Sequence, residues 1–378
     1  MVGGSTRDYW FCSHPSVSSA VAEFIASGAN MVTKAGLKIG AAILVLSMAG
    51  ISPAWSISDD AKIKAALENA YSKVVKMNGG KNADYIPALA KVDPKIFGIA
   101  LVTADGRVYT TGDVKSEVSI QSISKVFTLA MVMDQQGPAA VEKTIGVDAT
   151  GQAFNSIVAI EQYKGAEMNP LVNPGAIATT SMVKGDGRRG IWKNILEAYG
   201  EFAGRPLSVN AEVFKSESET NQRNQAIAAL MYAYGRIKDN PARATDIYTE
   251  QCAVSVNAKD LAIMAATLAN GGKNPVTGKT VMKAANVPEV LAVMATAGLY
   301  DDSGKWLAKT GLPAKSGVGG GIIAVVPGKY GIASISPPLD SAGNSYKAQL
   351  AIAEVDKALG SNPYNVTPYN GAKMAGGE

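Results

Sequence analysis

Ser122 and Lys125 are the residues of this 378-residue chain whose types and spacing first point to chemistry. They stand in the run Gln121-Ser122-Ile123-Ser124-Lys125, at the start of an apolar segment with helical period. Residues three apart on a helix share one face, so the two side chains are expected to lie within reach of each other. A serine hydroxyl becomes a nucleophile when a lysine with a lowered pKa takes its proton. The spacing therefore predicts Ser122 as nucleophile and Lys125 as base, although a helix cap followed by a solvated lysine gives the same pattern.

A second motif, Lys315-Ser316-Gly317, precedes Val318 and the run Gly319-Gly320-Gly321 at the start of a predicted strand. A Lys-[Ser/Thr]-Gly triplet on a sheet edge beside Ser-x-x-Lys is the pairing seen in serine β-lactamases and penicillin-binding proteins. There the strand supplies an oxyanion N–H, its lysine adds positive charge and its glycine allows close backbone approach. A bulge or a loop is the alternative explanation of the glycine run.

Histidine and cysteine counts exclude several kinds of site. The single histidine, His14, precedes the expected mature start, so a Ser-His-Asp triad, a Cys-His pair and a histidine zinc site have no histidine to use. The two cysteines are Cys12 and Cys252, and removal of Cys12 leaves neither an intrachain disulfide nor a thiolate cluster. We therefore expect no metal and no cofactor.

The first 56 residues have the pattern of a leader with a signal peptide that begins at Met31. Lys34 and Lys38 form a short basic region, and the apolar stretch 39–49 that follows is too short for a comfortable membrane span. Small residues around Ala54 then offer a cleavage site. This pattern predicts a periplasmic or secreted protein without a stable membrane span in its mature form. An uncleaved anchor helix is the alternative, and a leader without function would leave the protein in the cytoplasm.

The overall composition is that of a globular protein, with 47% hydrophobic and 18% charged residues. The formal net charge of +4 is small, and its charges are scattered along the chain. Since no long basic run and no basic stretch interleaved with aromatics occurs, we do not expect nucleic acid as a partner.

Strand patterns occur early and late in the chain, and helical patterns lie between them. Apolar β-branched runs predict strands at 96–102, 107–110, 319–326 and 331–335. Helical periods predict helices at 59–77, after Ser122, and at 224–234, 260–269 and 345–359. This order predicts an α+β fold in which an antiparallel sheet from both chain ends is flanked by helices. We expect a catalytic domain over 57–360, a helical subdomain inserted at roughly 140–275, and a tail over 361–378.

Further segments resemble one family closely. They lie in order between Asp84 and Asp340 and comprise Asp84–Ala90, Gln121–Lys125, Asn155-Ser156, Asn169–Asn173 with Gly175–Ile177, Ser216–Glu219, Arg223-Asn224, Tyr248 with Gln251-Cys252, Asp260–Ala262, Leu268–Gly272, Gly298–Asp301 and Gly311–Gly321. With these segments the chain resembles the serine-dependent glutaminase family, which has a serine β-lactamase-like fold. The resemblance covers most of the predicted mature protein.

The resemblance implies a reaction and the residues that perform it. Ser122 is expected to attack the side-chain amide of L-glutamine and form a glutamyl ester, with Lys125 as proton acceptor. Tyr300, and also Tyr85, would pass the proton to the leaving ammonia. The backbone N–H groups of Ser122 and Val318 would form the oxyanion hole. Water would then release glutamate.

The same resemblance implies a set of substrate-binding residues. Glu217 suits the cationic α-amino group of the substrate, and Asn173, Asn224 and Tyr248 suit its remaining polar atoms. Ser122, Tyr300 and Val318 complete the substrate contacts, and Lys315, Ser316 and Gly317 support them. Taken without the family, the two asparagines are equally typical of turns or caps, the tyrosine of the core, and Glu217 of a polar, loop-like run.

Three other functions stay open from the sequence. A penicillin-binding or β-lactam-hydrolysing enzyme shares both lysine motifs. A non-catalytic glutamine-binding protein is possible on the same fold, and so is a specificity for asparagine. We also expect a homo-oligomer, either a dimer or a tetramer.

Overall fold

The structure is a computed structural model that describes residues 57–366 and residue 368. The predicted leader and signal peptide lie in residues 1–56, outside the described residues, and so does most of the predicted tail. Within the described part of the chain, no helix is both long enough and apolar enough to cross a membrane.

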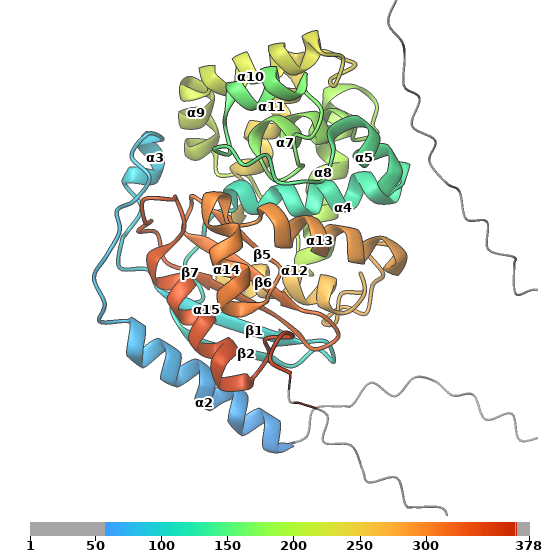
Figure 1. Cartoon of the computed structure of the whole chain (residues 1–378). Coiled ribbons are helices and arrows are strands. Elements are labelled where there is room, and N and C mark those ends of the chain that lie inside the picture. The colour runs from blue at the N-terminus through green and yellow to red at the C-terminus, as the bar shows by residue number, and fades with distance from the viewer. Residues whose placement is uncertain (1–56, 367, 369–378) are drawn as a thin grey trace, which may run out of the picture. The chain divides into compact units, whose positions relative to one another are not determined.

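The central sheet consists of five antiparallel strands: β1 (Gly98–Thr103), β2 (Val108–Gly112), β5 (Ala314–Gly317), β6 (Gly321–Val326) and β7 (Tyr330–Ile335). Their order is β2-β1-β7-β6-β5 (Figure 1). Strand β1 pairs with β7 in a register that places Val102 opposite Gly331. Segments more than 200 residues apart thus lie side by side, as the strand patterns at both ends of the chain predict. Strand β5 is an edge strand, and its Lys315 lies opposite Ile323.

The inner strands are buried on both faces. Every residue of β1, β6 and β7 is buried, and alternate residues enter two different apolar clusters. On β1, Ile99 and Leu101 belong to one cluster, whereas Ala100 and Val102 belong to the other. This is the two-residue period of a strand covered on both sides. It explains why the sequence shows continuous apolar runs here instead of alternation.

Helices cover the two faces of the sheet. Helices α2 (Ile57–Val74) and α15 (Tyr346–Leu359) pack on each other and on one face, and Figure 1 shows them side by side. Helix α12 (Ala258–Ala269) packs on β1, β6 and β7 from the other face. It begins with a capping box, in which the Asn257 and Asp260 side chains each accept a backbone N–H of the other residue.

The segment between β2 and β5 is mainly helical. A short antiparallel pair, β3 (Val118–Ser119) with β4 (Ser255–Val256), brackets most of it. The other elements of this segment are η1 (Gln121–Ile123), α4 (Ser124–Gln136), α5 (Pro138–Ile145), α6 (Ile157–Tyr163), α7 (Asn173–Ser181), α8 (Gly187–Ala203), α9 (Ala211–Thr220), α10 (Gln222–Ala233), α11 (Pro241–Cys252), η2 (Ala284–Asn286), α13 (Val287–Ala297), η3 (Tyr300–Asp302) and α14 (Ser303–Thr310). The short helix α3 (Pro87–Ala90) lies outside it, between α2 and β1.

The long periodic segments form the predicted helices. Helices α2, α10, α12 and α15 match the predicted ranges with shifts of a few residues at their ends, and α4 is the apolar helix that follows Ser122. The pair β3–β4 was not predicted, because two-residue strands show no period. Its existence matters for the site, since β3 leads directly into the segment that carries Ser122.

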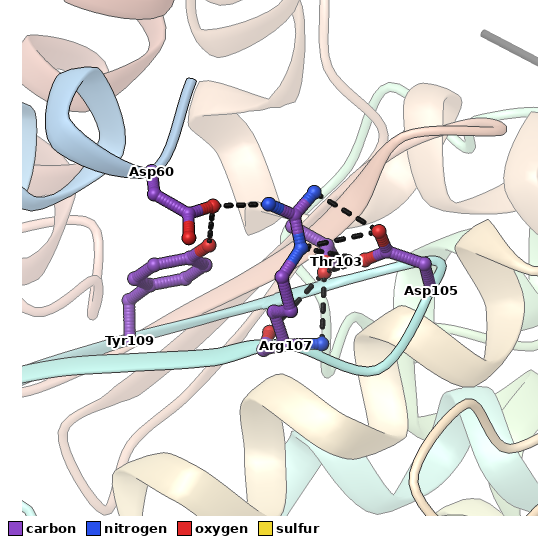
Figure 2. A network of polar contacts seen from close by, with 5 residues as sticks. All are labelled: Asp60, Thr103, Asp105, Arg107 and Tyr109. Atoms are coloured by element: carbon purple, nitrogen blue, oxygen red, sulfur yellow. Dashed lines mark hydrogen bonds and ion pairs between the residues drawn. The ribbon is translucent and has the colours of Figure 1, made fainter. Parts of the chain in front are cut away.

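A polar network ties α2 to the β1–β2 hairpin (Figure 2). Asp60 on α2 accepts a hydrogen bond from the Tyr109 hydroxyl at 2.5 Å and pairs with the Arg107 guanidinium. Arg107 also pairs with Asp105 at 2.9 Å, and Asp105 accepts the Thr103 hydroxyl. The network holds the first turn of α2 against the edge of the sheet.

Candidate active site

Ser122 lies in the short 3₁₀ turn η1, directly before α4. The preceding residue, Gln121, has a backbone φ of +50°, in the left-handed region that L-residues rarely adopt. This turn redirects the chain from β3 into α4. The Ser122 side chain lies at the start of the helix, and the residue is 8% exposed. The structure confirms that Ser122 and Lys125 lie at the start of a helix.

Lys125 is buried in the first turn of α4. Its ammonium donates to Asn173 Oδ1 at 2.7 Å and lies 3.5 Å from the carbonyl oxygen of Leu171. Among the described residues, no hydrogen bond joins this ammonium to the Ser122 hydroxyl. Burial lowers the pKa of Lys125 to about 8, because an ammonium loses its hydration there. The lysine thus has a pKa that suits a general base, while its hydrogen bonds go to Asn173 and Leu171 and not to Ser122.

Asn173, the first residue of α7, is the centre of this polar cluster. Its side-chain oxygen accepts from Lys125 and from the Tyr248 hydroxyl, the latter at 3.3 Å. Its side-chain nitrogen donates to Asn224 Oδ1 at 2.9 Å. Burial holds the pKa of Tyr248 well above its usual range, so the phenol stays protonated and donates. The structure therefore joins three predicted substrate-binding residues, Asn173, Asn224 and Tyr248, to the predicted base through hydrogen bonds that meet at Asn173.

Glu217 lies on helix α9, and not in the loop-like run that the sequence suggested. The polar residues around it form the exposed face of an amphipathic helix, whereas Glu217 itself is buried. One carboxylate oxygen accepts the Gln121 side-chain amide at 3.2 Å. Burial raises the pKa of Glu217 to about 7, against the opposing effects of the Gln121 hydrogen bond and the Lys125 charge. A buried carboxylate of this kind favours a cationic ligand group.

The motif Lys315-Ser316-Gly317 forms the edge strand β5, as the sequence predicts. An added Cβ at Gly317 would lie 2.7 Å from the carbonyl oxygen of Ile120, and one at Gly319 would lie 2.2 Å from that of Ser119. Only glycine permits so close an approach of two backbones. The approach brings Val318, between the two glycines, beside the segment that leads into Ser122.

Tyr300 also has a left-handed backbone, with φ of +52°. Its hydroxyl donates to the carbonyl oxygen of Ser316 at 3.2 Å. Burial raises the pKa of Tyr300, and a hydrogen bond with the Ser122 side chain opposes that rise. The Tyr300 ring packs against Phe154 at a centroid distance of 4.8 Å. The phenol thus lies between the predicted nucleophile and strand β5.

A cavity of about 370 Å³ collects most of the predicted residues. Its lining includes Tyr85, Ile86, Gln121, Ser122, Phe154, Asn155, Asn173, Glu217, Thr220, Asn221, Arg223, Asn224, Tyr248 and Val318. Lys125, Tyr300 and the Lys315–Gly317 strand do not line it but contact residues that do. Tyr85 stands at its rim, with 57% of its surface exposed. A larger hollow of about 730 Å³ lies over α8 and contains none of the predicted site residues.

The chain matches a family that is described as glutaminase, over residues 80–364. The chain belongs to the glutaminase family. A glutaminase of Colwellia psychrerythraea is 54% identical over 300 residues, which cover 79% of this chain and 96% of the relative. A glutaminase of Brucella canis is also 54% identical, over 82% of this chain and 97% of the relative.

Solved glutaminase structures have the same fold. A probable glutaminase, ybaS, superposes with a TM-score of 0.80 at 47% identity, over 81% of this chain and 99% of its own. A probable glutaminase from Bacillus subtilis, complexed with 6-diazo-5-oxo-L-norleucine, has a TM-score of 0.71 at 27% identity, over 82% and 99%. These matches confirm the predicted family and the predicted α+β fold class.

Seven of the fourteen residues that line the cavity were not predicted as site residues from the sequence. They are Ile86, Gln121, Phe154, Asn155, Thr220, Asn221 and Arg223. Arg223 donates to the carbonyl oxygen of Asn155 at 3.0 Å, at the mouth of the cavity. Gln121, Asn155 and Arg223 fall in the segments that carry the family resemblance, which was the available signal for them. Phe154 has no such signal, because an isolated aromatic residue in a loop is typical of packing.

Proposed function

We propose that this chain hydrolyses L-glutamine to L-glutamate and ammonia through an ester formed on Ser122. The observation that carries the proposal is the cavity in which Ser122, Glu217 and Asn173 line one space beside a buried lysine. A carboxylate suits the α-ammonium of glutamine, and a serine hydroxyl suits the carbonyl of its side-chain amide. Membership in the glutaminase family supports the same reaction.

In the first half of the reaction, the Ser122 oxygen attacks the amide carbon while its proton passes to Lys125. The low pKa of about 8 leaves part of the lysine neutral near neutral pH, as a base requires. In the free chain the Lys125 ammonium donates to Asn173 and Leu171. Substrate binding must therefore bring the amine and the hydroxyl together, as is common for catalytic hydrogen bonds that tighten only in the complex.

The developing oxyanion is held by the backbone N–H groups of Ser122 and Val318. Among the described residues, the Val318 N–H has no hydrogen-bond acceptor and remains available for this role. Tyr300 passes the proton from Lys125 to the departing nitrogen, because its phenol is buried and the Ser122 side chain affects its pKa. Tyr85, at the rim, is the second phenol near the leaving group. Water then attacks the ester, with Lys125 again as base, and glutamate leaves.

Substrate recognition combines one buried carboxylate with neutral hydrogen-bonding groups of the cavity wall. Glu217 binds the α-ammonium, and its burial strengthens that ion pair. Asn224 and Tyr248 bind the α-carboxylate region through hydrogen bonds, with Asn173 holding both side chains in place. Lys315, Ser316 and Gly317 keep β5 and Val318 in position.

Ammonia release from L-glutamine by the full chain tests the proposal. Ser122→Ala should lower kcat by on the order of ten-thousand-fold, because the ester cannot form. L-Asparagine and the chromogenic β-lactam nitrocefin serve as competing substrates, and turnover of either in preference to glutamine would replace the proposed activity. Tight glutamine binding without ammonia release would indicate a binding protein.

We also propose that the chain is exported through a cleaved leader and forms a homo-oligomer. The pattern from Met31 to Ser56 supports export through a cleaved signal peptide, and N-terminal sequencing of exported protein tests it. An N-terminus at Met1 or Met31 in the mature protein would contradict cleavage. For the assembly we propose a dimer or a tetramer, and sedimentation of the purified chain would distinguish these two from a monomer.

A further inference from the structure

Gln121 is the one residue of η1 whose backbone is left-handed, and its side chain is buried at 3% exposure. A glycine would adopt this backbone without strain, whereas a long side chain has a cost there. The position therefore holds a side chain at an energetic disadvantage, directly before Ser122. The contacts of the Gln121 side chain must account for its presence at this position.

The Gln121 amide nitrogen bridges two buried groups. It donates to Ser119 Oγ and to Glu217 Oε2, both at 3.2 Å. Ser119 belongs to β3, the strand that precedes η1, so one end of the bridge is anchored in the backbone that carries the nucleophile. The other end is the carboxylate on α9.

The titratable groups that interact electrostatically with Glu217 do not replace this contact. They are Lys125 from α4, Tyr248 and Cys252 from α11, and Tyr85 ahead of α3. The Lys125 ammonium donates to Asn173 and Leu171 instead, and no salt bridge of the described residues includes Glu217. A neutral amide is thus the hydrogen-bond donor that holds the carboxylate, and the carboxylate forms no ion pair with another described residue.

We infer that Gln121 is a positioning and specificity-determining residue, which orients the Glu217 carboxylate without neutralising it and so selects substrates that carry a free ammonium group. This inference rests on the proposed function of Glu217. It predicts that the hydrogen bond of Gln121 improves binding of an ammonium substrate and has no effect on a substrate that lacks one. It also couples recognition of the ammonium to the turn that presents Ser122.

The test compares L-glutamine with 5-amino-5-oxopentanoate, which has the same side-chain amide and carboxylate but no amino group. Gln121→Met keeps the length of the side chain and removes the donor. It should lower kcat/KM for L-glutamine by about 10- to 100-fold, mainly through KM, and leave the amino-free substrate within about threefold. Gln162→Met, at an exposed position of α6, is the matched control and should change neither. Equal losses on both substrates, or no loss on either, would overturn the inference.

A double-mutant cycle separates this role from a structural one. Once Glu217→Gln has removed the carboxylate, adding Gln121→Met should cost less than about twofold on L-glutamine. If the full loss persists in that background, Gln121 acts elsewhere. Gln121→Asn provides a second variant in case the methionine does not fold, because asparagine tolerates the left-handed backbone but is too short to bridge.

Calorimetric binding of L-glutamate keeps the two proposals distinguishable. If the wild-type chain releases no ammonia from L-glutamine, the proposed function fails, yet Gln121→Met should still weaken L-glutamate binding by about tenfold and leave glutarate binding unchanged. The inference about Gln121 would be overturned if the variant bound L-glutamate as tightly as the wild type does. It would also be overturned if the wild type did not bind L-glutamate. If ammonia is released but discrimination is unaffected, only the inference fails.

Discussion

The ammonium of Lys315 lies 4.3 Å from the centre of the Tyr300 ring. It also donates to the carbonyl oxygens of Gly298 and Ser316, at 3.0 and 2.7 Å. Burial and the nearby Lys125 charge hold the pKa of Lys315 well below its usual range. Since Tyr300 has a left-handed backbone and donates to the same Ser316 carbonyl, Lys315 fixes both the turn before Tyr300 and the face of its ring.

Lys315→Met is expected to lower kcat by about tenfold with a smaller change in KM, since a misplaced phenol affects proton transfer more than binding. It should also lower the free energy of unfolding by about 1–3 kcal/mol, because two buried carbonyl groups lose a donor. Steady-state kinetics and thermal melting measure both effects. Lys309→Met, at an exposed position of α14, is the control. Wild-type kcat in a folded Lys315→Met variant would contradict the role of Lys315.

Tyr300→Phe keeps the ring between Lys315 and Phe154 and removes only the hydroxyl. We expect kcat to fall by about 100- to 10,000-fold, as for the loss of a proton-transfer group, with KM changed much less. Tyr85→Phe is the matched comparison. Because Tyr85 is largely exposed at the rim, its loss should cost about tenfold or less. The reverse order of the two effects would assign the proton transfer to Tyr85.

The pH profile follows from two groups whose deprotonation favours the reaction. Glu217, with a pKa raised to about 7, must be ionised, and Lys125, with a pKa lowered to about 8, must be neutral. Both requirements are met as pH rises, so kcat/KM should increase from pH 6 to pH 9, by on the order of 100-fold or more. Initial rates at constant ionic strength measure this limb. Lys125→Arg should be inactive at every pH, because a guanidinium does not deprotonate. A wild-type kcat/KM that falls between pH 6 and pH 9 would exclude Lys125 as the base.

Asp60→Ala tests the network between α2 and the hairpin. Removing the carboxylate takes a partner from Arg107 and from Tyr109, which should lower the free energy of unfolding by about 1–2 kcal/mol and the Tm by a few degrees. The specific activity should not change, because none of these residues lines the cavity. Glu68→Ala, an exposed change on the same helix, should stay within about 0.5 kcal/mol of wild type. An Asp60→Ala variant that melts like wild type would show that the network adds no stability.

Local patterns in the sequence predict the regular elements well. The runs that form β1 and β6 are continuously apolar because both faces of these strands are covered, and the period of α12 reflects its packing on the sheet. The spacing of Ser122 and Lys125 depends only on the geometry of one helix start. The close approach of the backbone at Gly317 to the Ile120 carbonyl is likewise indicated in the sequence by a glycine, which has no side chain.

The sequence by itself determined the family, the fold class and the residue types available for the reaction. Tertiary structure decided how those residues are connected: Lys125 contacts Asn173, 48 positions away, and Gln121 contacts Glu217, 96 positions away. It also decided that Glu217 is a buried helical residue and that Gln121 is left-handed. These properties arise from the packing of α4, α7 and α9 around one cavity, and no local period encodes the hydrogen bonds between elements that meet only in the folded chain.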